Sequence, residues 1–117
     1  MRHLSFAMTT EQIRNRTKTC TRRMRWLFAK AGDVVQPVVK GQGLKKGEHV
    51  ERIGGPIRFT KVTREFLYGV WRDGECAREG FPGMGPAEFV VMFCKVNKCQ
   101  PGTCVTRIEF EYLEEKP

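Results

Sequence analysis

Residues 105–113 have the sequence VTRIEFEYL, the most regular stretch of the chain. In it Ile108 and Phe110 alternate with Arg107, Glu109 and Glu111. Alternation of apolar and charged residues with a period of two is typical of a β-strand, because successive side chains point to opposite faces of a sheet. The stretch therefore predicts a strand, and with it a domain built on a β-sheet.

Weaker patterns earlier in the chain predict more strands. Val34 to Val39 is β-branched, although Pro37 favours a sheet edge or a bulge because proline has no N–H to donate. Other stretches alternate apolar and polar residues or are rich in threonine, and we expect strands at 4–8, 17–23 and 57–63.

Short helices are expected between these strands. Thr9 or Thr10 can cap a helix over 11–16 with Ile13 facing inward, and a helix over 73–79 would stop at Gly80. Pro86 can occupy the first turn of a helix that continues to Cys94. Residues 24–31 favour a helix, whereas 66–71 fit a helix or a strand. Strands outnumber helices, so we predict an α+β domain: a small mixed β-barrel with short helices on its flank.

The length and the charge limit the function classes. A chain of 117 residues fits one domain, which we place at 1–117. It carries 21 Lys and Arg against 13 Asp and Glu, a net charge of +8. Such a surface attracts polyanions, and nucleic acid is the default polyanion in a cell. We therefore expect nucleic acid or a nucleotide as the partner.

The expected compartment follows from what the sequence lacks. Residues near Met1 form no apolar run of signal-peptide length, and no stretch approaches the roughly 20 apolar residues of a membrane span. We therefore expect a cytoplasmic monomer with mostly reduced thiols. Cys94, Cys99 and Cys104 recur at every fifth residue, which is not the spacing of a zinc site, so we predict no metal and no cofactor.

The most informative stretch is 16–23, with the sequence RTKTCTRR. In an extended conformation Thr19, Thr21 and Arg23 would share one face, with Lys18 at the start of the strand. One interpretation is a ligand-binding surface. The other is a solvated basic edge that protects the sheet from pairing with other chains.

A second stretch, 78–82, has the sequence REGFP. It places Glu79 at a predicted helix end, followed by Gly80 and the aromatic Phe81. Taken alone, this pattern is typical of a helix cap with an aromatic core anchor.

Together the two stretches resemble the ASCH domain family. The resemblance covers most of the chain and depends on the order and spacing of several short motifs. These are Leu4-Ser5-Phe6, Lys18-Thr19-x-Thr21-x-Arg23, Gly32-Asp33-Val34, Glu79-Gly80-Phe81 and Arg107-Ile108-Glu109-Phe110. The resemblance implies a compact barrel related to the PUA fold that acts on or binds RNA or nucleosides.

Within that family, the Lys-Thr-x-Thr-x-Arg pattern followed by a glutamate is similar to the active site of small bacterial N4-acetylcytidine amidohydrolases. The likeness implies that Lys18, Thr21 and Glu79 are catalytic, with Lys18 as the base, Thr21 as nucleophile or water-holding donor, and Glu79 as the acid. The long basic segment 40–56, which contains five glycines, departs from that pattern.

Other side chains are expected to bind the substrate. Arg23 would orient a phosphate or the carbonyl oxygen, and Trp26 or Phe81 would stack on the base or simply pack in the core. Thr19, Lys45 and Lys46 complete the predicted substrate-binding set. The rival functions are a non-catalytic RNA-binding module and, third, a ribonuclease.

Overall fold

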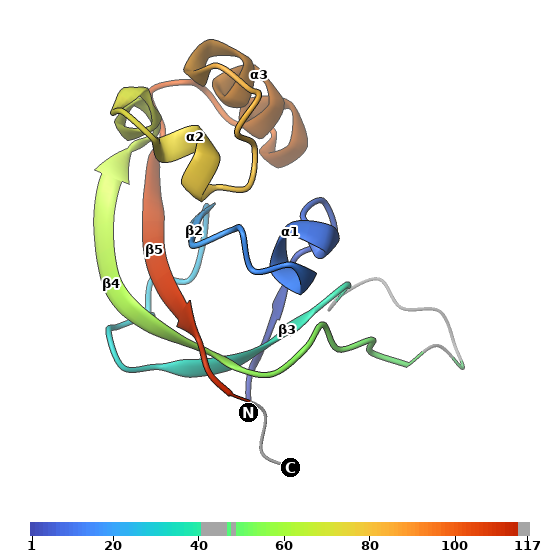
Figure 1. Cartoon of the computed structure of the whole chain (residues 1–117). Coiled ribbons are helices and arrows are strands. Elements are labelled where there is room, and N and C mark those ends of the chain that lie inside the picture. Colours follow the sequence, from blue (N-terminus) through green and yellow to red (C-terminus); the bar gives the residue numbers. More distant parts are fainter. Residues whose placement is uncertain (41–46, 48, 115–117) are drawn as a thin grey trace.

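The computed structural model describes residues 1–40, 47 and 49–114. Its strands form one mixed sheet in the order β1-β3-β4-β5-β2 (Figure 1). The strands are β1 (His3–Ser5), β2 (Cys20–Arg23), β3 (Val34–Val38), β4 (Ile57–Phe66) and β5 (Cys104–Tyr112). The helical elements are α1 (Thr10–Arg14), the 3₁₀ helix η1 (Leu67–Trp71), α2 (Glu75–Arg78) and α3 (Pro86–Asn97). Within the described ranges, no helix is long and apolar enough to cross a membrane.

The antiparallel pair of β4 and β5 forms the spine of the sheet. The two strands are paired from Ile57 and Tyr112 to Phe66 and Cys104, with one irregularity between Phe59 and Lys61. The strand predicted over 105–113 is confirmed, and the one over 57–63 is longer than predicted. β5 is covered on both faces, so even its charged face is largely buried.

The two edges of the sheet approach each other without pairing. β1 pairs only with β3 and β2 only with β5, and β3 changes partner along its length. A side chain joins the edges, because Arg23 Nη2 donates to the Ser5 carbonyl oxygen at 2.7 Å. The α+β class is confirmed, but the sheet does not close into the predicted barrel. β1 has three residues and β2 has four, which leaves little backbone for a closing ladder.

The helices agree with the local sequence signals in most places. α1, α2 and α3 confirm the helices predicted near 11–16, 73–79 and from Pro86, and 66–71 becomes η1. The helix favoured over 24–31 is wrong, since those residues form turns and irregular backbone. Pro37 lies in β3 between two neighbouring strands, not at an edge, and its carbonyl oxygen accepts from Ile53 N at 3.0 Å.

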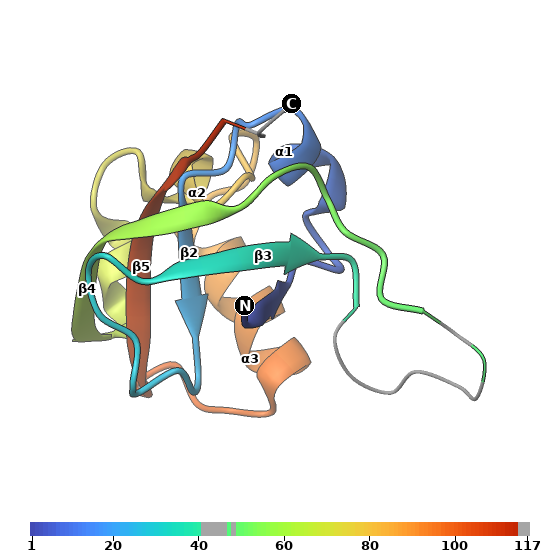
Figure 2. The same ribbon diagram turned by 90° about the horizontal axis from the view of Figure 1, so that it is seen from below.

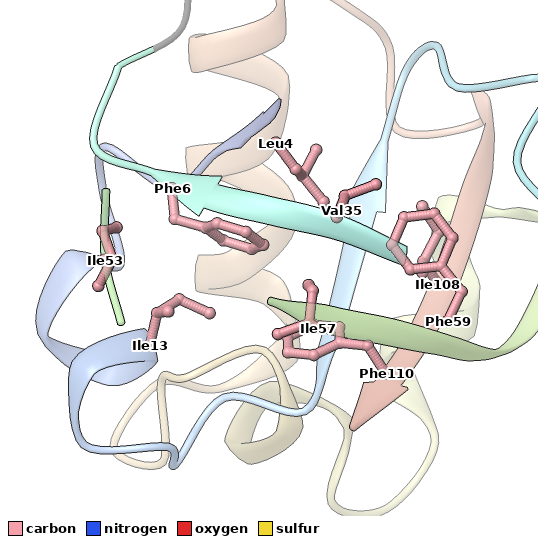
Figure 3. Packing of buried hydrophobic residues seen from close by; sticks show 9 residues of the cluster. All are labelled: Leu4, Phe6, Ile13, Val35, Ile53, Ile57, Phe59, Ile108 and Phe110. Atoms are coloured by element: carbon pink, nitrogen blue, oxygen red, sulfur yellow. The ribbon is translucent and has the colours of Figure 1, made fainter. Parts of the chain in front are cut away.

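Two apolar cores flank a polar layer. The first fills the curve of the sheet (Figure 3), and β3 crosses it on one side (Figure 2). The second lies under η1, α2 and α3, at one end of β4 and β5 (Figure 1). The candidate site lies where the two cores meet. The first core comprises Leu4, Phe6, Ile13, Val35, Ile53, Ile57, Phe59, Ile108 and Phe110.

Candidate functional site

Backbone hydrogen bonds fix Lys18 just before β2. Its own N–H donates to Gln12 O at 3.2 Å, and the next N–H, of Thr19, donates to Arg78 O at 2.8 Å. The Thr19 carbonyl oxygen in turn accepts from Phe110 N at 3.0 Å. These bonds tie the segment to α1, to α2 and to β5, so the Lys18 side chain is aimed at the end of α2.

Lys18 and Glu79 form a buried ion pair. Lys18 Nζ lies 3.0 Å from Glu79 Oε1, and each side chain is 4% exposed. The same ammonium donates to the Glu79 carbonyl oxygen at 2.6 Å. Burial strengthens such charge-assisted bonds but also imposes a desolvation cost of several kcal/mol per ion, so the pair adds little net stability. A buried ion pair that contributes little to the free energy of unfolding is a candidate for a catalytic role.

Arg22 holds the other oxygen of Glu79. Its Nη1 donates to Glu79 Oε2 at 3.0 Å, while its Nη2 donates to Glu65 Oε2 at 3.1 Å and to Glu75. The Arg22 side chain is fully buried. The two carboxylate oxygens of Glu79 are therefore divided between Lys18 and Arg22, which fixes the plane of the carboxylate.

A hollow of about 240 Å³ opens beside this pair. Its walls combine the open edge of the sheet with α3, so Phe6 of the first core faces Phe89 of the second across it. The volume lies slightly below the range of about 300–1,000 Å³ for ligand pockets, which suits a ligand as small as a nucleoside. The polar and charged residues of the wall are Ser5, Thr9, Lys18, Thr21, Arg22, Arg23, Glu79 and Asn97.

Thr21 and Arg23 lie on the opposite face of β2 from Arg22. Arg23 Nε donates to Thr21 Oγ1 at 2.9 Å, and its guanidinium lies 4.8 Å from the centre of the Phe6 ring. With Nε on Thr21 and Nη2 on Ser5, Arg23 keeps Nη1 without a protein partner among the described residues. Arg23 thus holds the Thr21 hydroxyl in place, and the Nη1 of the same guanidinium is available to a ligand.

The backbone of β2 also has unused groups. In an antiparallel pair of strands, every second residue is hydrogen-bonded to the neighbouring strand. The bond from Phe110 N to Thr19 O shows that the odd-numbered residues of β2 are the bonded ones. Thr21 and Arg23 therefore make the bonds to β5, whereas the N–H and C=O of Cys20 and Arg22 point away from it. These groups face the side of β2 on which the hollow opens.

Burial alters the acid–base behaviour of the site. Burial lowers the pKa of Lys18 below its ordinary value; Glu79 opposes this effect and Arg23 adds to it. Burial and the Glu79 carboxylate raise the pKa of the Cys20 thiol to about 12. The Cys20 thiol is therefore protonated at neutral pH and is a poor nucleophile.

The structure brings most of the predicted site residues together. Lys18, Thr21 and Glu79, the predicted catalytic set, line one hollow, although they come from stretches about sixty residues apart. Arg23 and Phe81, both predicted to bind substrate, line the same hollow.

The remaining residues predicted to bind substrate are Thr19, Trp26, Lys45 and Lys46. Thr19 is exposed and contributes backbone bonds, not a side chain, to the site. Trp26 packs against Phe28 and Phe59 and is absent from the wall of this hollow, because the chain turns at its positive φ of 66°. Lys45 and Lys46 lie outside the described residues.

The sequence analysis missed the ion cluster behind the pair. Arg107 donates to both oxygens of Glu75 at 2.8 and 3.0 Å, and Glu75 also accepts from Arg22. Spacing could have indicated it. Glu75 and Glu79 are four residues apart and share a helix face, while Lys18 and Arg22 share a strand face.

The turn after Glu79 requires glycine. Gly80 has a φ of +98°, and an added Cβ would lie 3.1 Å from Gln12 Cβ and Cγ. We expect Gly80→Ala to lower the free energy of unfolding by about 1–2 kcal/mol, because an L side chain is strained there. Gly83→Ala is the matched control: it meets nothing within 4 Å at an ordinary φ, so it is expected to change stability by under about 0.5 kcal/mol. Urea unfolding of both variants measures the difference, and equal midpoints would contradict the role of Gly80.

No metal site accompanies these residues: in the part of the chain that the structure describes, no three His, Cys, Asp or Glu side chains are close enough to hold an ion. All five cysteines are free.

Comparison with known proteins supports the fold. No family model matches the chain, and no curated protein matches it. The crystal structure of protein EF3133 from Enterococcus faecalis V583, of the family DUF984, matches with a TM-score of 0.64. The match covers 99% of this chain and 84% of that chain at 14% sequence identity. At that identity the likeness extends to the small α+β fold and assigns neither a family nor an activity to this chain.

Proposed function

We propose that the protein is an ASCH-type amidohydrolase that removes the acyl group from N4 of an acylated cytidine nucleoside. The observation that carries the proposal is the buried Lys18–Glu79 pair, with Thr21 on the wall of the same hollow. The resemblance of the motif order to N4-acetylcytidine amidohydrolases supplies the substrate class. The small hollow is compatible with one nucleoside.

The pair can supply both a base and an acid. Transfer of one proton from Lys18 Nζ to Glu79 Oε1, across 3.0 Å, gives a neutral amine beside a carboxylic acid. The lowered pKa of Lys18 favours the amine form. This single proton transfer therefore generates base and acid in one step.

The amine then activates the attacking oxygen. In one route Lys18 takes the proton of a water held by Thr21, and the water oxygen bonds to the amide carbon. In the other route Lys18 takes the proton of the Thr21 hydroxyl and Thr21 Oγ1 bonds to the amide carbon; cytidine leaves, and water later hydrolyses the threonine ester. Both routes give a tetrahedral oxyanion. Arg23 would stabilise it through Nη1, which has no partner among the residues that the structure describes.

Collapse of this intermediate completes the reaction. The Glu79 carboxylic acid donates its proton to N4 as the carbon–nitrogen bond breaks, which releases cytidine. The water route releases the carboxylic acid at the same step, and the threonine route releases it when water hydrolyses the ester. The acid ionises in water, and Lys18 and Glu79 are again ammonium and carboxylate. One water is consumed for each acyl group removed.

The test is a direct assay. The protein is incubated with N4-acetylcytidine, and the product is separated by chromatography; we expect cytidine and acetate in equal amounts. N4-methylcytidine is the matched control, because it has no carbonyl for attack and should stay intact. If no acylated cytidine is turned over by folded protein, the amidohydrolase proposal is excluded.

A non-catalytic RNA-binding module remains the second candidate, because the net charge of +8 favours a polyanion. In that case RNA would bind with a steep salt dependence, and Lys18→Ala would alter no chemical step. A gel shift at two salt concentrations, together with the nucleoside assay, separates the two functions.

A further inference from the structure

A second hollow adjoins the first. Its volume is about 460 Å³, and it shares Ser5, Arg23 and Asn97 with the wall of the first. Arg23 therefore lies between the two spaces. A ligand too large for the first hollow would extend into this second space, which we call the second groove. The second groove is lined by His3, Leu4, Ser5, Arg23, Met24, Arg25, Trp26, Lys40 and Asn97.

The second groove is cationic. Arg23, Arg25 and Lys40 line it, and no carboxylate does within the part of the chain that the structure describes. Arg25 and Lys40 are exposed, and neither forms an ion pair with any residue that the structure describes. Arg2, just outside the groove, differs because its guanidinium is bonded to Asp33 at 3.1 Å. Among residues 1–40, 47 and 49–114, no carboxylate therefore neutralises Arg25 or Lys40 of the groove.

We infer that this groove binds the phosphate of a nucleotide whose base occupies the first hollow. The inference rests on the proposed function and narrows its substrate from a nucleoside to a phosphorylated nucleoside. Arg23 Nη1, free of protein partners among the described residues, lies at the junction of base and phosphate spaces. Arg25 supplies a planar fork for phosphate oxygens, and Lys40 a point charge.

Phosphate fits these observations better than an acidic peptide does. The groove shares Ser5, Arg23 and Asn97 with the wall of the proposed base hollow, so one ligand would carry both groups. Its volume suits a phosphate with its sugar, not a folded partner. The phosphate can be the monoester of a mononucleotide or a diester of single-stranded RNA, since both present the same anionic oxygens.

The first experiment compares substrates. The kcat/KM is measured for N4-acetylcytidine, its 5′-monophosphate, and a short single-stranded RNA with one N4-acetylcytidine. We expect kcat/KM to be about tenfold or more higher for the phosphorylated forms. The ratio of kcat/KM for the monophosphate to kcat/KM for the RNA distinguishes a monoester site from a diester site.

The double variant Arg25→Ala, Lys40→Ala tests the groove. Its loss of kcat/KM for phosphorylated substrate should exceed its loss for the nucleoside by about tenfold. Lys61→Ala, on the exposed side of β4, is the control. Equal losses for all three substrates would overturn the inference.

A binding experiment separates this inference from the proposed function. Trp26 lines the groove and Trp71 does not, so fluorescence in a Trp71→Phe background reports on the groove. Cytidine 5′-monophosphate should bind at least tenfold more tightly than cytidine, and the Arg25→Ala, Lys40→Ala variant should lose that difference. Binding of this kind without any amide hydrolysis would sink the proposed function and leave a phosphate site. Equal affinity for the two ligands would sink the phosphate site, whatever the protein hydrolyses.

Discussion

Glu75→Gln is expected to lower the free energy of unfolding by about 3–5 kcal/mol, the cost of removing one partner from a buried ion cluster. The Glu75 carboxylate is 5% exposed and accepts from two arginines, Arg107 at 2.8 and 3.0 Å and the fully buried Arg22. A glutamine side chain of the same size has no charge, and its amide nitrogen cannot accept the bond that Arg107 Nη2 donates to Glu75 Oε2. The two guanidinium groups would then lie close together without this counter-charge, and urea unfolding measures the loss.

The same substitution should change the pH dependence of stability. Burial alone would raise the pKa of Glu75, but hydrogen bonds from Arg107 and Arg22 outweigh burial and hold it at about 2. Because the folded pKa lies below the unfolded value of 4.5, Glu75 stabilises the fold above about pH 4.5. That contribution is lost as the pH falls toward 2. The stability gap between wild type and Glu75→Gln should therefore narrow in acid.

Glu111→Gln provides the matched control. The Glu111 side chain is 52% exposed and pairs with the half-exposed Arg58 at 3.3 Å, so its loss should cost less than about 1 kcal/mol. If Glu75→Gln were as mild as Glu111→Gln, the buried cluster would not be the structural element described above.

The sequence predicted the secondary structure correctly where a single strong local pattern was present. The alternation in 105–113 marks β5, Pro86 marks the start of α3, and Gly80 marks the end of the turn after α2. Each of these signals acts within a few residues, so no tertiary information was needed. Residues 24–31 do not form the helix that their composition favours, because Trp26 has a positive φ of 66°, outside the right-handed helical region, and Leu27 and Phe28 stay exposed.

Tertiary placement was less accessible to sequence reasoning. The motif order suggested that Lys18, Thr21 and Glu79 would meet. Spacing within each stretch could suggest which side chains share a face, but it could not show that Arg22 would bridge Glu65, Glu75 and Glu79. These partners are 43 to 57 residues from Arg22 in the chain. An arginine in a basic run is normally solvated, and only the packing of α2 onto β2 and β5 buries this one.

The polar layer between the two cores has a cost in stability. Apolar residues of similar volume in place of a buried ion pair are often neutral or stabilising. The chain nevertheless keeps Lys18, Arg22 and Glu79 desolvated beside a hollow. The cost is understandable if the layer holds a base and an acid at a fixed distance for a reaction.

Lys18→Met is expected to lower the kcat for N4-acetylcytidine hydrolysis by about 10²–10⁴-fold, the usual contribution of a general base. Methionine keeps the length and apolar stem of the side chain but cannot take a proton. Glu79 would retain its bond from Arg22 at 3.0 Å, so the variant should remain folded. Lys61→Met, an exposed lysine on β4, is the control for the loss of a positive charge.

The pH profile distinguishes a chemical role of Lys18 from a structural one. The mechanism needs the Lys18 proton, because that proton becomes the acid on Glu79, so in the wild type log(kcat/KM) should fall when a rising pH removes it. Burial lowers the pKa of Lys18, so this fall should begin below the ordinary lysine value of 10.5. This limb should be missing from Lys18→Met. Lys18→Ala leaves space in the hollow, and added methylamine should restore part of its activity by replacing the lost base. Full activity in Lys18→Met, or a wild-type pH limb that persists in it, would remove Lys18 from the reaction because no other amine lines this hollow among the described residues.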